Sequence, residues 1–466
     1  MSFIDSAIER ISPAFALRRE IARRKLFAVR AFEGASLSPR MDRWGLASYK
    51  DTYKDRKYLR QRARYLVDNN PYAARALATL SSYTIGKGII PHIDDSAKAI
   101  SIFERSLKHW ADSEACDVEG YTNLYGLQAL IVKNLIVDGE VFVQRVFDKS
   151  AIIPIKLRLI EASKLDETKS TNDGKIQHGI EYAGNGQIAA YWFASDEAQE
   201  SKRVDADDIA HVFRKDRAGQ SRGVSWFAPI LTRLKDFDDF EDAELLRQKL
   251  SASIVGVFRD LEAQGDDFGE KSSIPKEIKP GSIFEAPAGQ TIEFFAPPAP
   301  AGSSAYITHI KMTLAIGLGI PYMLLAGDYS NSNFSSSRLS MLNFYKYIDQ
   351  IQSLVLIPTF CNPVARWFEE ACSLKMQAPP LKMAWTPPKK DLTDPIKEIE
   401  AMRRTVEAGF CAHQDVIREL GEDPEDVYQR IDTSNKLIDQ KGFSFSTDYR
   451  NKKEFQGENK ITQSRS

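Results

Sequence analysis

Cysteine is scarce in this chain, and its spacing argues against a CxxC metal or redox site and against a disulfide-rich fold. No two cysteines form a CxxC pair, and four in 466 residues are too few for a disulfide framework. The four lie at Cys116, Cys361, Cys372 and Cys411. This usage is typical of a reduced, intracellular chain.

Histidine is equally sparse. The six histidines lie far apart, and none forms an HxxxH or HExxH pattern. We therefore interpret His109, His178 and His211 as surface or core polar groups rather than metal ligands, and we expect no metal site.

Long apolar runs and an excess of one charge are also missing. No stretch reaches the roughly 18 apolar residues of a membrane span, and the first residues, "MSFIDSAIERISPAF", carry acids where a signal peptide needs bases. We expect a protein that is made in the cytosol and stays out of the bilayer.

The formal net charge is −1, which excludes a uniformly basic nucleic-acid binder. Residues 1–65 nevertheless hold sixteen Lys/Arg against seven Asp/Glu, so this end favours a polyanion or an acidic partner.

The usual enzyme motifs do not occur. "GKG" at 86–88 and "GLG" at 317–319 do not match GxxxxGK[ST], and "GVSWF" at 223–227 lacks the second glycine of a nucleophile elbow. We expect no catalytic residue and no cofactor.

The apolar patterns predict an α+β, mainly helical fold. Helices are expected on both sides of a break at Asn69-Asn70-Pro71, then in "SAKAISIFERSLKHWADSEA" and "NLYGLQALIVKNLIV". Strands are expected in "EVFVQRVF", "PIKLRLI" and "IAHVFRK", with a hairpin around Asn185-Gly186. Strands and crossover helices do not alternate, which argues against a doubly wound nucleotide fold.

A long helix is predicted to begin at Trp226. Apolar residues recur every three or four positions, and neither Pro nor Gly interrupts the stretch between Pro229 and Gly256, so a helix of roughly 30 residues would reach about 45 Å. One part of it is crowded with carboxylates, which form either a solvated face or a surface that keeps a polyanion at a distance. They are Asp236, Asp238, Asp239, Glu241, Asp242 and Glu244.

A polar bridge, "GIPYMLLAGDYSNSNFSSSRL" (319–339), joins two later helices. The helix after it should begin at its serines and end at Pro358. Beyond that, Asp394-Pro395 and Asp423-Pro424 each predict the start of a helix, and a third is expected in "AHQDVIREL". The residues after Lys441 are polar, and we expect them to be disordered.

Two functional alternatives remain open at this point. In the first, the chain is a cytosolic enzyme whose loop 325–338 closes over a phosphorylated ligand, using serine hydroxyls and Arg338. In the second, it is a DNA-binding regulator that uses its C-terminal helices, although "AMRRTVEAGF" places the bases on the first helix rather than on a recognition helix.

The chain resembles phage portal proteins of the lambda family from about residue 50 to 435. The stretches that carry the resemblance are "RQRARYLVDNNPYAARA", "GIEYAGNGQIAAYWF", "RAGQSRGVSWFAPIL", "DAELLRQKLSAS" and the polar bridge. Two departures are mild. Asp68 stands where the family usually has a basic residue before Asn-Asn-Pro, and Phe334 stands where it usually has tyrosine.

The resemblance implies a portal fold with wing, two-helix stem, clip, tunnel loop and helical crown. The implied parts are a basic N-terminal arm (1–50), a wing (51–225), a first stem helix (226–257), a clip (258–302), a second stem helix (303–324), a tunnel loop (325–337), a helix returning to the wing (338–390), a crown (391–440) and a polar tail (441–466).

It also implies a ring at one capsid vertex, with twelve copies by family analogy, through which double-stranded DNA passes without sequence specificity during packaging and ejection. The implied partners are the terminase large subunit, a head-completion protein and the major capsid or scaffold protein, first in the host cytoplasm and then in the virion.

The tunnel loop would line this channel. Its residues are Ser330, Asn331, Ser332, Asn333, Phe334, Ser335, Ser336, Ser337 and Arg338. Two roles stay open for Arg338, a weak grip on DNA or a pair with Asp328.

Overall fold

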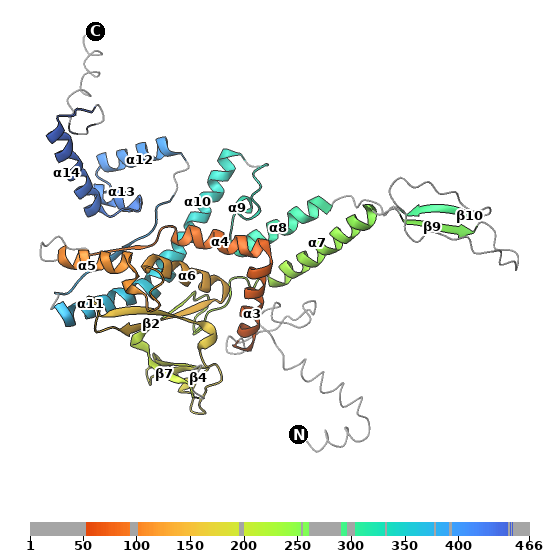
Figure 1. Cartoon of the computed structure of the whole chain (residues 1–466), viewed down its shortest axis with the longest axis horizontal. Helices are drawn as coiled ribbons and strands as arrows, with labels where there is room; N and C mark the ends of the chain where they lie inside the picture. Colours follow the sequence, from red (N-terminus) through yellow and green to blue (C-terminus); the bar gives the residue numbers. More distant parts are fainter. Residues whose placement is uncertain are drawn as a thin grey trace, which may run out of the picture. The chain divides into compact units, whose positions relative to one another are not determined.

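The computed structural model is mainly helical with small sheets, as predicted (Figure 1). It describes residues 53–93, 101–194, 200–252, 255–260, 290–295, 303–330, 333–376, 379–390, 394–445, 448 and 450. The predicted basic arm, most of the predicted clip and most of the predicted tail lie outside these residues.

The chain divides into two compact units. The first comprises the residues up to Tyr83, Ile131–Gln144 and Leu159–Gln350. The second comprises Thr84–Leu130, Arg145–Arg158 and the residues from Ile351 onward.

Helices α3 (Tyr53–Asn69) and α4 (Pro71–Ile85) open the described chain. Asn70 separates them, because its Oδ1 accepts the N–H groups of Tyr72 (2.9 Å) and Ala73 (3.0 Å) at the start of α4. Pro71, at the first helical position, has no N–H that needs a partner. The predicted break at Asn-Asn-Pro is confirmed.

The first unit contains a four-stranded antiparallel sheet in the order β4-β5-β6-β7. Its strands are β4 (Ile176–Gln177), β5 (Ile180–Tyr182), β6 (Ile188–Phe193) and β7 (Lys202–Asp205). Gly186 adopts φ +81° in the turn between β5 and β6, which confirms the predicted Asn-Gly hairpin.

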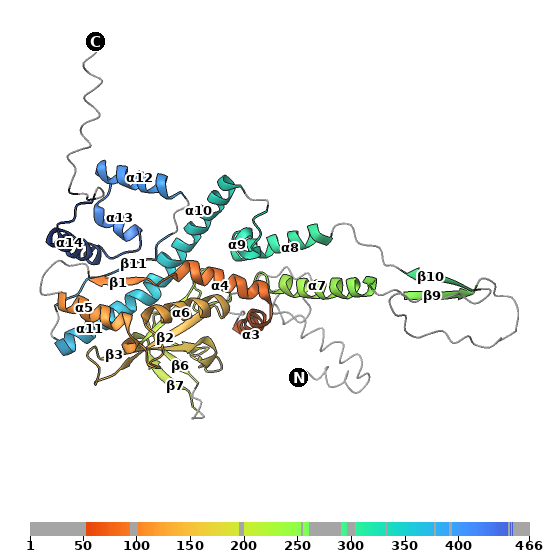
Figure 2. The same cartoon turned by 45° about the horizontal axis from the view of Figure 1, so that its top comes forward.

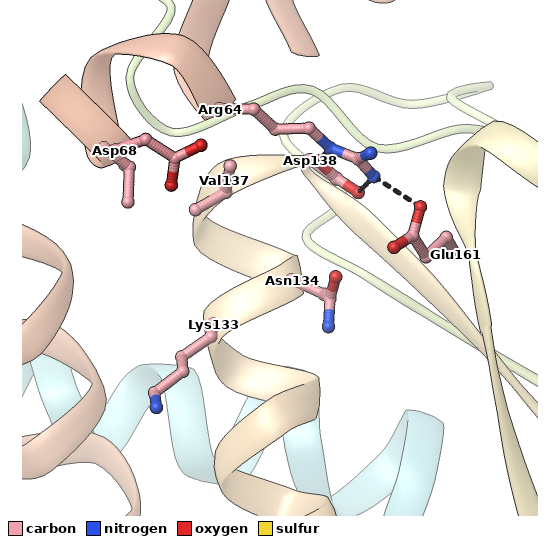
Figure 3. A pocket seen from close by; sticks show the side chains of 8 residues that line it. Arg64, Asp68, Lys133, Asn134, Val137, Asp138 and Glu161 are labelled. Carbon is pink, nitrogen blue, oxygen red and sulfur yellow. Dashed lines mark hydrogen bonds and ion pairs between the residues drawn. The ribbon is translucent and has the colours of Figure 1, made fainter. Parts of the chain in front are cut away.

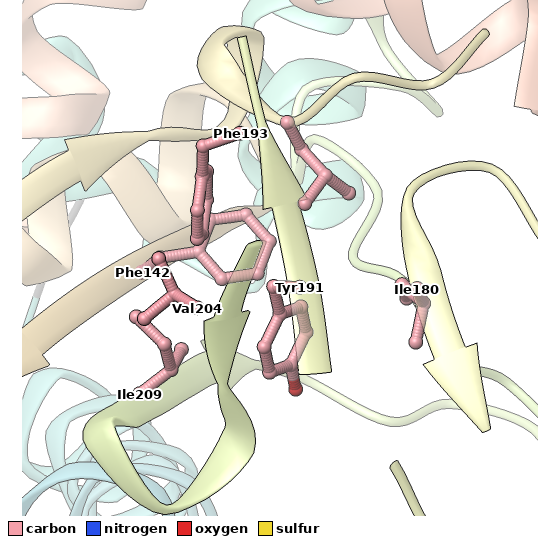
Figure 4. Packing of buried hydrophobic residues seen from close by; sticks show 7 residues of the cluster. Phe142, Ile180, Tyr191, Phe193, Val204 and Ile209 are labelled. Carbon is pink, nitrogen blue, oxygen red and sulfur yellow. The ribbon is translucent and has the colours of Figure 1, made fainter. Parts of the chain in front are cut away.

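A second sheet has the order β3-β2-β8. It is built from β2 (Glu140–Phe147), β3 (Ile155–Glu161) and β8 (Ile209–Phe213), close to the three predicted strands. Short 3-10 turns, η4 (Ala162–Lys164) and η5 (Ala206–Asp208), connect the strands. Buried residues of both sheets share one core, in which Phe142 lies 5.3 Å from Tyr191 and 5.2 Å from Phe193 between ring centroids (Figure 4).

Two helices of the first unit run side by side and lead to a hairpin (Figures 1 and 2). They are α7 (Leu231–Ala252) and α8 (Ser303–Leu318), and the hairpin pairs β9 (Val255–Asp260) with β10 (Gln290–Phe295). The rings of Phe240 and Tyr306 pack across the helices at 4.9 Å. Gly317, on α8, lies against Ile230, the residue directly before α7. A Cβ added at Gly317 would meet Ile230 Cγ2 at 2.2 Å, so a larger side chain does not fit here without a shift of Ile230.

The helix predicted over 226–257 is shorter at both ends. The residues before Leu231 form a buried turn, in which Ala228 N–H donates to Ser225 O (3.1 Å) and Pro229 contributes no N–H. At the other end Val255 already pairs with Phe295 in the hairpin. Strand pairing therefore overrides the helical periodicity that continued into this stretch.

The polar bridge contains the short helix α9 (Tyr322–Ala326) and the first residues of α10 (Phe334–Ile351). The predicted failure of the helix at Gly319 is confirmed, since this residue has φ +68°. The predicted helix end at Pro358 is wrong. A π-helical segment, η6 (Gln352–Cys361), carries the chain past Pro358 into α11 (Asn362–Met376). The wider π-helical turn accommodates a ring that would break a regular α-helix.

The second unit contains α5 (Ser101–Asp112) and α11. The helix α6 (Leu124–Val137) is divided, with Leu124–Leu130 in the second unit and the residues from Ile131 in the first. Trp110 is buried, donates from Nε1 to Ile155 O (3.0 Å) and packs 5.7 Å from the Phe368 ring. The unit also holds the turn η3 (Glu114–Cys116) and the antiparallel pair β1 (Ile90–Ile93) and β11 (Met383–Thr386).

Three more helices of this unit begin where the sequence predicted. They are α12 (Pro395–Glu407), α13 (His413–Glu419) and α14 (Pro424–Lys441). Across the described part of the chain, no helix has the length and apolar character needed to cross a bilayer.

Candidate functional site

Within the polar bridge, the residues that directly follow α9, Gly327–Ser330, form a tightly hydrogen-bonded turn. Gly327 ends α9 with φ +66°. The Asp328 carboxylate then accepts the N–H and the hydroxyl of Ser330 at 3.0 and 2.6 Å and the hydroxyl of Tyr322 at 3.2 Å. The bonds from Ser330 lower the pKa of Asp328, so it is ionised at neutral pH.

The loop is shorter than predicted, because the serines after Asn333 are helical. Asn333 begins α10, with its Oδ1 accepting the N–H of Ser336 at 2.8 Å. Phe334 to Arg338 therefore occupy the first turns of α10. Phe334 is 60% exposed and Ser335 and Ser336 are exposed, so these side chains still present a polar surface with one aromatic ring. Asn331 and Ser332 lie outside the described residues.

Arg75 holds the helix from which this loop begins. No sequence pattern singled this residue out. Arg75, on α4, donates from Nε to the carbonyl of Leu324 at 3.1 Å. Leu324 lies near the end of the five-residue helix α9, where Met323 O accepts the Gly327 N–H at 3.0 Å and the carbonyl groups that follow have no N–H of the helix ahead of them. The side chain of Arg75 thus ties the loop root to the first unit.

The six carboxylates of α7 separate into two groups. Asp238 accepts Asn70 Nδ2 at 2.6 Å, Glu241 accepts the Tyr72 hydroxyl at 3.0 Å, and Glu244 pairs with Arg247. Burial and Glu241 raise the pKa of Tyr72 to about 12. The other three carboxylates are exposed, and they are Asp236, Asp239 and Asp242. Of these, Asp239 pairs with Lys235.

A buried charge cluster centres on Glu140, at the start of β2. Its carboxylate accepts Arg222 Nε at 2.8 and 2.9 Å, Gly223 N–H at 2.8 Å and His211 Nε2 at 3.0 Å. Arg222 also pairs with Glu167 at 3.0 Å. This confirms His211 as a core polar group.

Electrostatics keep this cluster fixed. Burial alone opposes ionisation of Glu140, but Arg222 and His211 hold its pKa well below the usual range. Burial lowers the pKa of His211, so the ring is neutral at pH 7. Arg222, Gly223 and His211 all bond to the Glu140 carboxylate, and we interpret the cluster as the anchor of the segment that precedes α7. The sequence signal was a glutamate directly before the apolar run Val141–Val143.

The first unit also has an open polar cavity of about 290 Å³ (Figure 3). Arg64 donates there to Asp138 at 2.8 and 2.5 Å and to Glu161 at 2.9 Å. Burial raises the pKa of Asp138, and the bond to Asp138 raises that of Arg64. The lining residues are Arg64, Val67, Asp68, Lys133, Asn134, Val137, Asp138 and Glu161. None belongs to the polar bridge, so the cavity does not join the predicted loop residues into a ligand site.

Among the residues that the structure describes, no three His, Cys, Asp or Glu side chains gather as metal ligands. The three features therefore remain separate: an exposed polar loop, a divided acidic helix and a closed internal charge cluster.

Comparisons with known proteins extend over most of the chain. The family model described as "Phage portal protein, lambda family" matches residues 38–352. The chain is 28% identical to a probable portal protein of Halomonas phage phiHAP-1, with 81% of this chain and 80% of that protein covered. It is 21% identical to portal protein B of Escherichia phage lambda, with 79% and 81% covered.

Solved structures are also similar. The chain matches a subunit from the neck of the native GTA particle, computed with C12 symmetry, with a TM-score of 0.49 and 15% identity over 78% of this chain and 94% of that one.

Proposed function

Because this chain belongs to the lambda family of phage portal proteins, we propose that its copies close into a ring at one capsid vertex and conduct double-stranded DNA during packaging and ejection. The family match over residues 38–352 carries the proposal. The ring acts as the head-tail connector and has no enzymatic activity of its own. ATP hydrolysis belongs to the terminase.

The exposed loop between α9 and α10 suits a channel that must not adhere to DNA. Duplex DNA carries one phosphate per about 1.7 Å, and a lining that neutralised many phosphates would bind tightly through counterion release. Hydroxyl and amide groups exchange hydrogen bonds between water and phosphate without that strong attraction. Asn333, Ser335 and Ser336 supply such groups, and exposed carboxylates on α7 (Asp236, Asp239, Asp242) repel phosphates from the wall.

The remaining assignments follow from the family. Twelve copies form the ring, the clip (258–302) contacts the terminase large subunit and later a head-completion protein, and wing and crown face the capsid interior. The basic arm (1–50) contacts acidic capsid or scaffold surfaces or packaged DNA. The protein acts in the host cytoplasm during assembly and at the portal vertex of the virion.

The two alternatives lack a supporting observation. The serines of an enzyme lid lie in the first turns of α10, and the cavity is lined by other residues. For the regulator, the bases Arg403 and Arg404 lie on the first of the C-terminal helices and not on a recognition helix, and both donate to Glu400 at 2.9 Å.

Electron microscopy of the purified protein tests the proposal. We expect end-on views of closed rings whose symmetry can be counted. Only monomers and dimers, at every concentration and salt tested, would refute the ring.

A triple variant, with alanine at Ser335, Ser336 and Ser337, separates the portal from the enzyme. In a portal, assembly stays intact and only DNA retention or packaging changes. Loss of saturable binding of a phosphorylated small molecule would favour the enzyme instead. A regulator would show sequence-dependent affinity in competition with random DNA.

A further inference from the structure

The last helix of the second unit, α14, has well-defined ends but buries very little of itself. Asp423 accepts the N–H of Glu425 at 2.8 Å at the start of the helix, and Gly442 ends it with φ +65°. Within α14 only Pro424 is buried, whereas α11, a helix of comparable length in the same unit, buries six residues. Because a helix of this length depends on packing for its stability, the contacts near Pro424 matter for holding α14 in place.

Charged side chains of α5 meet the start of α14. Lys108 pairs with Asp426, which lies two residues after Pro424, and both side chains are about half exposed. Glu104 precedes Lys108 by one helical turn and so lies on the same face of α5. It is half-buried, and its carboxylate accepts the Ile93 N–H at 2.9 Å.

Glu104 experiences two carboxylates of α14. Burial raises the pKa of Glu104 to about 7 against the bond from Ile93, and Asp423 and Asp426 raise it further, while Lys108 lowers it. One ammonium group therefore serves one half-buried carboxyl group of α5 and two carboxylates of α14.

Neighbouring elements bring further titratable groups to this contact. On α6, the Tyr125 hydroxyl donates to Asp112 at 3.0 Å, and burial raises the Tyr125 pKa, so this phenol is neutral at pH 8. On β1, His92 lies next to Ile93 and its ring bonds to the Thr386 hydroxyl at 3.4 Å. A substitution at Glu104 separates the titration of Glu104 from that of His92.

We propose that the contact between α5 and the start of α14 is a pH-sensitive latch, which is closed while Glu104 carries a proton and opens when Glu104 ionises beside Asp423 and Asp426. Ionisation places a third carboxylate near Lys108 and leaves a half-buried charge. Release of α14 hydrates Glu104 and separates the like charges, so raising the pH through about 7 favours the released helix. The latch lies within one unit of a single chain and does not depend on the proposed ring.

Hydrogen exchange of the full chain, followed by mass spectrometry, tests the latch in the wild type and in Glu104→Gln. Comparing the two proteins at the same pH removes the pH dependence of the chemical exchange step. At pH 8 the amides of α14 should exchange about tenfold more slowly in Glu104→Gln, the factor expected if release lowers the Glu104 pKa by about one unit. At pH 5.5 the two proteins should agree within about twofold. Equal exchange at pH 8 would overturn the proposal.

Two more variants identify the groups. Glu119→Gln makes the same change at an exposed position of the same unit and should leave the exchange of α14 as in the wild type. If it slows α14 as much as Glu104→Gln does, the latch is wrong. Asp423→Ser keeps a side-chain oxygen for the helix cap but removes one of the opposing carboxylates. In that background, adding Glu104→Gln should slow exchange at pH 8 by less than in the wild type, and an undiminished effect would contradict the repulsion.

Urea separates release of α14 from unfolding of the whole unit. Release of a helix with one buried residue exposes little surface, so about 1 M urea should hardly change the exchange of α14 while it accelerates that of α11. An equally steep urea dependence in both helices would assign the pH effect to global unfolding and refute the latch.

Discussion

The buried carboxylate of Glu140 joins β2, β8, α3 and the segment that precedes α7. Its oxygens receive donors from Arg222, Gly223 and His211, and Arg60 lies 4.0 Å away. A buried charge in this arrangement is costly unless every partner stays in place. The cluster therefore fixes the path of the chain before α7 more strictly than apolar packing alone.

Replacing Glu140 by Gln should destabilise the protein strongly. The substitution leaves the buried Arg222 with only the more exposed Glu167 as a counter-charge, and we expect a loss of about 3 kcal/mol in the free energy of unfolding. Denaturant unfolding followed by circular dichroism measures it. Glu167→Gln is the control, since Glu167 is 18% exposed and shares Arg222 with Glu140. Equal losses in both variants would show that burial of Glu140 is not the source of the effect.

Glu104 should make stability depend on pH. Burial raises its pKa to about 7, although it accepts the Ile93 N–H at 2.9 Å, and Asp423 and Asp426 add to the rise. A carboxyl with a raised pKa in the folded state stabilises most when protonated, so its contribution is present at low pH and is lost between about pH 4.5 and 7.

The variant Glu104→Gln removes this titration. We expect it to melt at a higher temperature than the wild type at pH 8 and at about the same temperature at pH 4.5. The difference between the two proteins isolates Glu104 from other titrating groups. A constant difference across this range would contradict the assignment.

At the scale of elements, α7 uses its carboxylates for two purposes. Asp238 and Glu241 hold the α3–α4 junction through Asn70 and Tyr72, while Asp242 is exposed. Asp238→Ala should therefore lower the free energy of unfolding by about 1 kcal/mol through the lost hydrogen bond. Asp242→Ala, on the same helix, should change it by less than about 0.5 kcal/mol. Chemical denaturation compares them, and the reverse order would refute the division of the acidic residues.

The short helix α9 depends on Arg75 for its position. Arg75→Met keeps the length of the side chain but removes the bond to Leu324 O. We expect faster hydrogen exchange at the amides of Gly327 and Ser330, with little change in global stability. Exchange measured by mass spectrometry on the whole chain reports this. Unchanged exchange in the loop would show that the α8–α9 packing alone sets its position.

Local signals predicted the elements that they control, and tertiary contacts decided the rest. Asn70-Pro71, Asn185-Gly186 and Asp394-Pro395 each encode a cap or a turn in two residues, and all three appear where expected. The C-terminal end of α7 was mispredicted because pairing of Val255 with Phe295 is a contact distant in sequence.

The same limit applied to the candidate site. The polar composition of 325–338 was visible, but Asn333 as a helix cap moved the serines from loop to helix. The bond of Arg75 to Leu324 joins residues 249 positions apart, and no local pattern announces it. Glu140 and Arg222 are likewise 82 positions apart.

At the scale of the whole molecule, the proposed ring multiplies the effect of each loop residue. A single hydroxyl has little influence on DNA, but the same position repeated around a ring forms a continuous band. Replacing Ser335 and Ser336 by Lys would place two added cations per copy beside the phosphates. We expect rings of this variant to bind duplex DNA more tightly, with a salt dependence steeper by about 0.9 in slope for each additional phosphate contacted.

Packaging should then slow or stall, because the DNA must break these contacts at every step of its movement. Binding measured over a series of salt concentrations, together with the amount of DNA packaged, tests the two consequences. Ala401→Lys with Ala408→Lys adds the same two cations at exposed positions of α12 and its end and serves as the control for net charge, and Ser335→Gln with Ser336→Gln controls for side-chain size. If the lysine loop variant binds DNA with the same salt slope as the double lysine variant of α12, the loop does not face the DNA. The carboxylates of α7 would then be the next candidates for the channel wall.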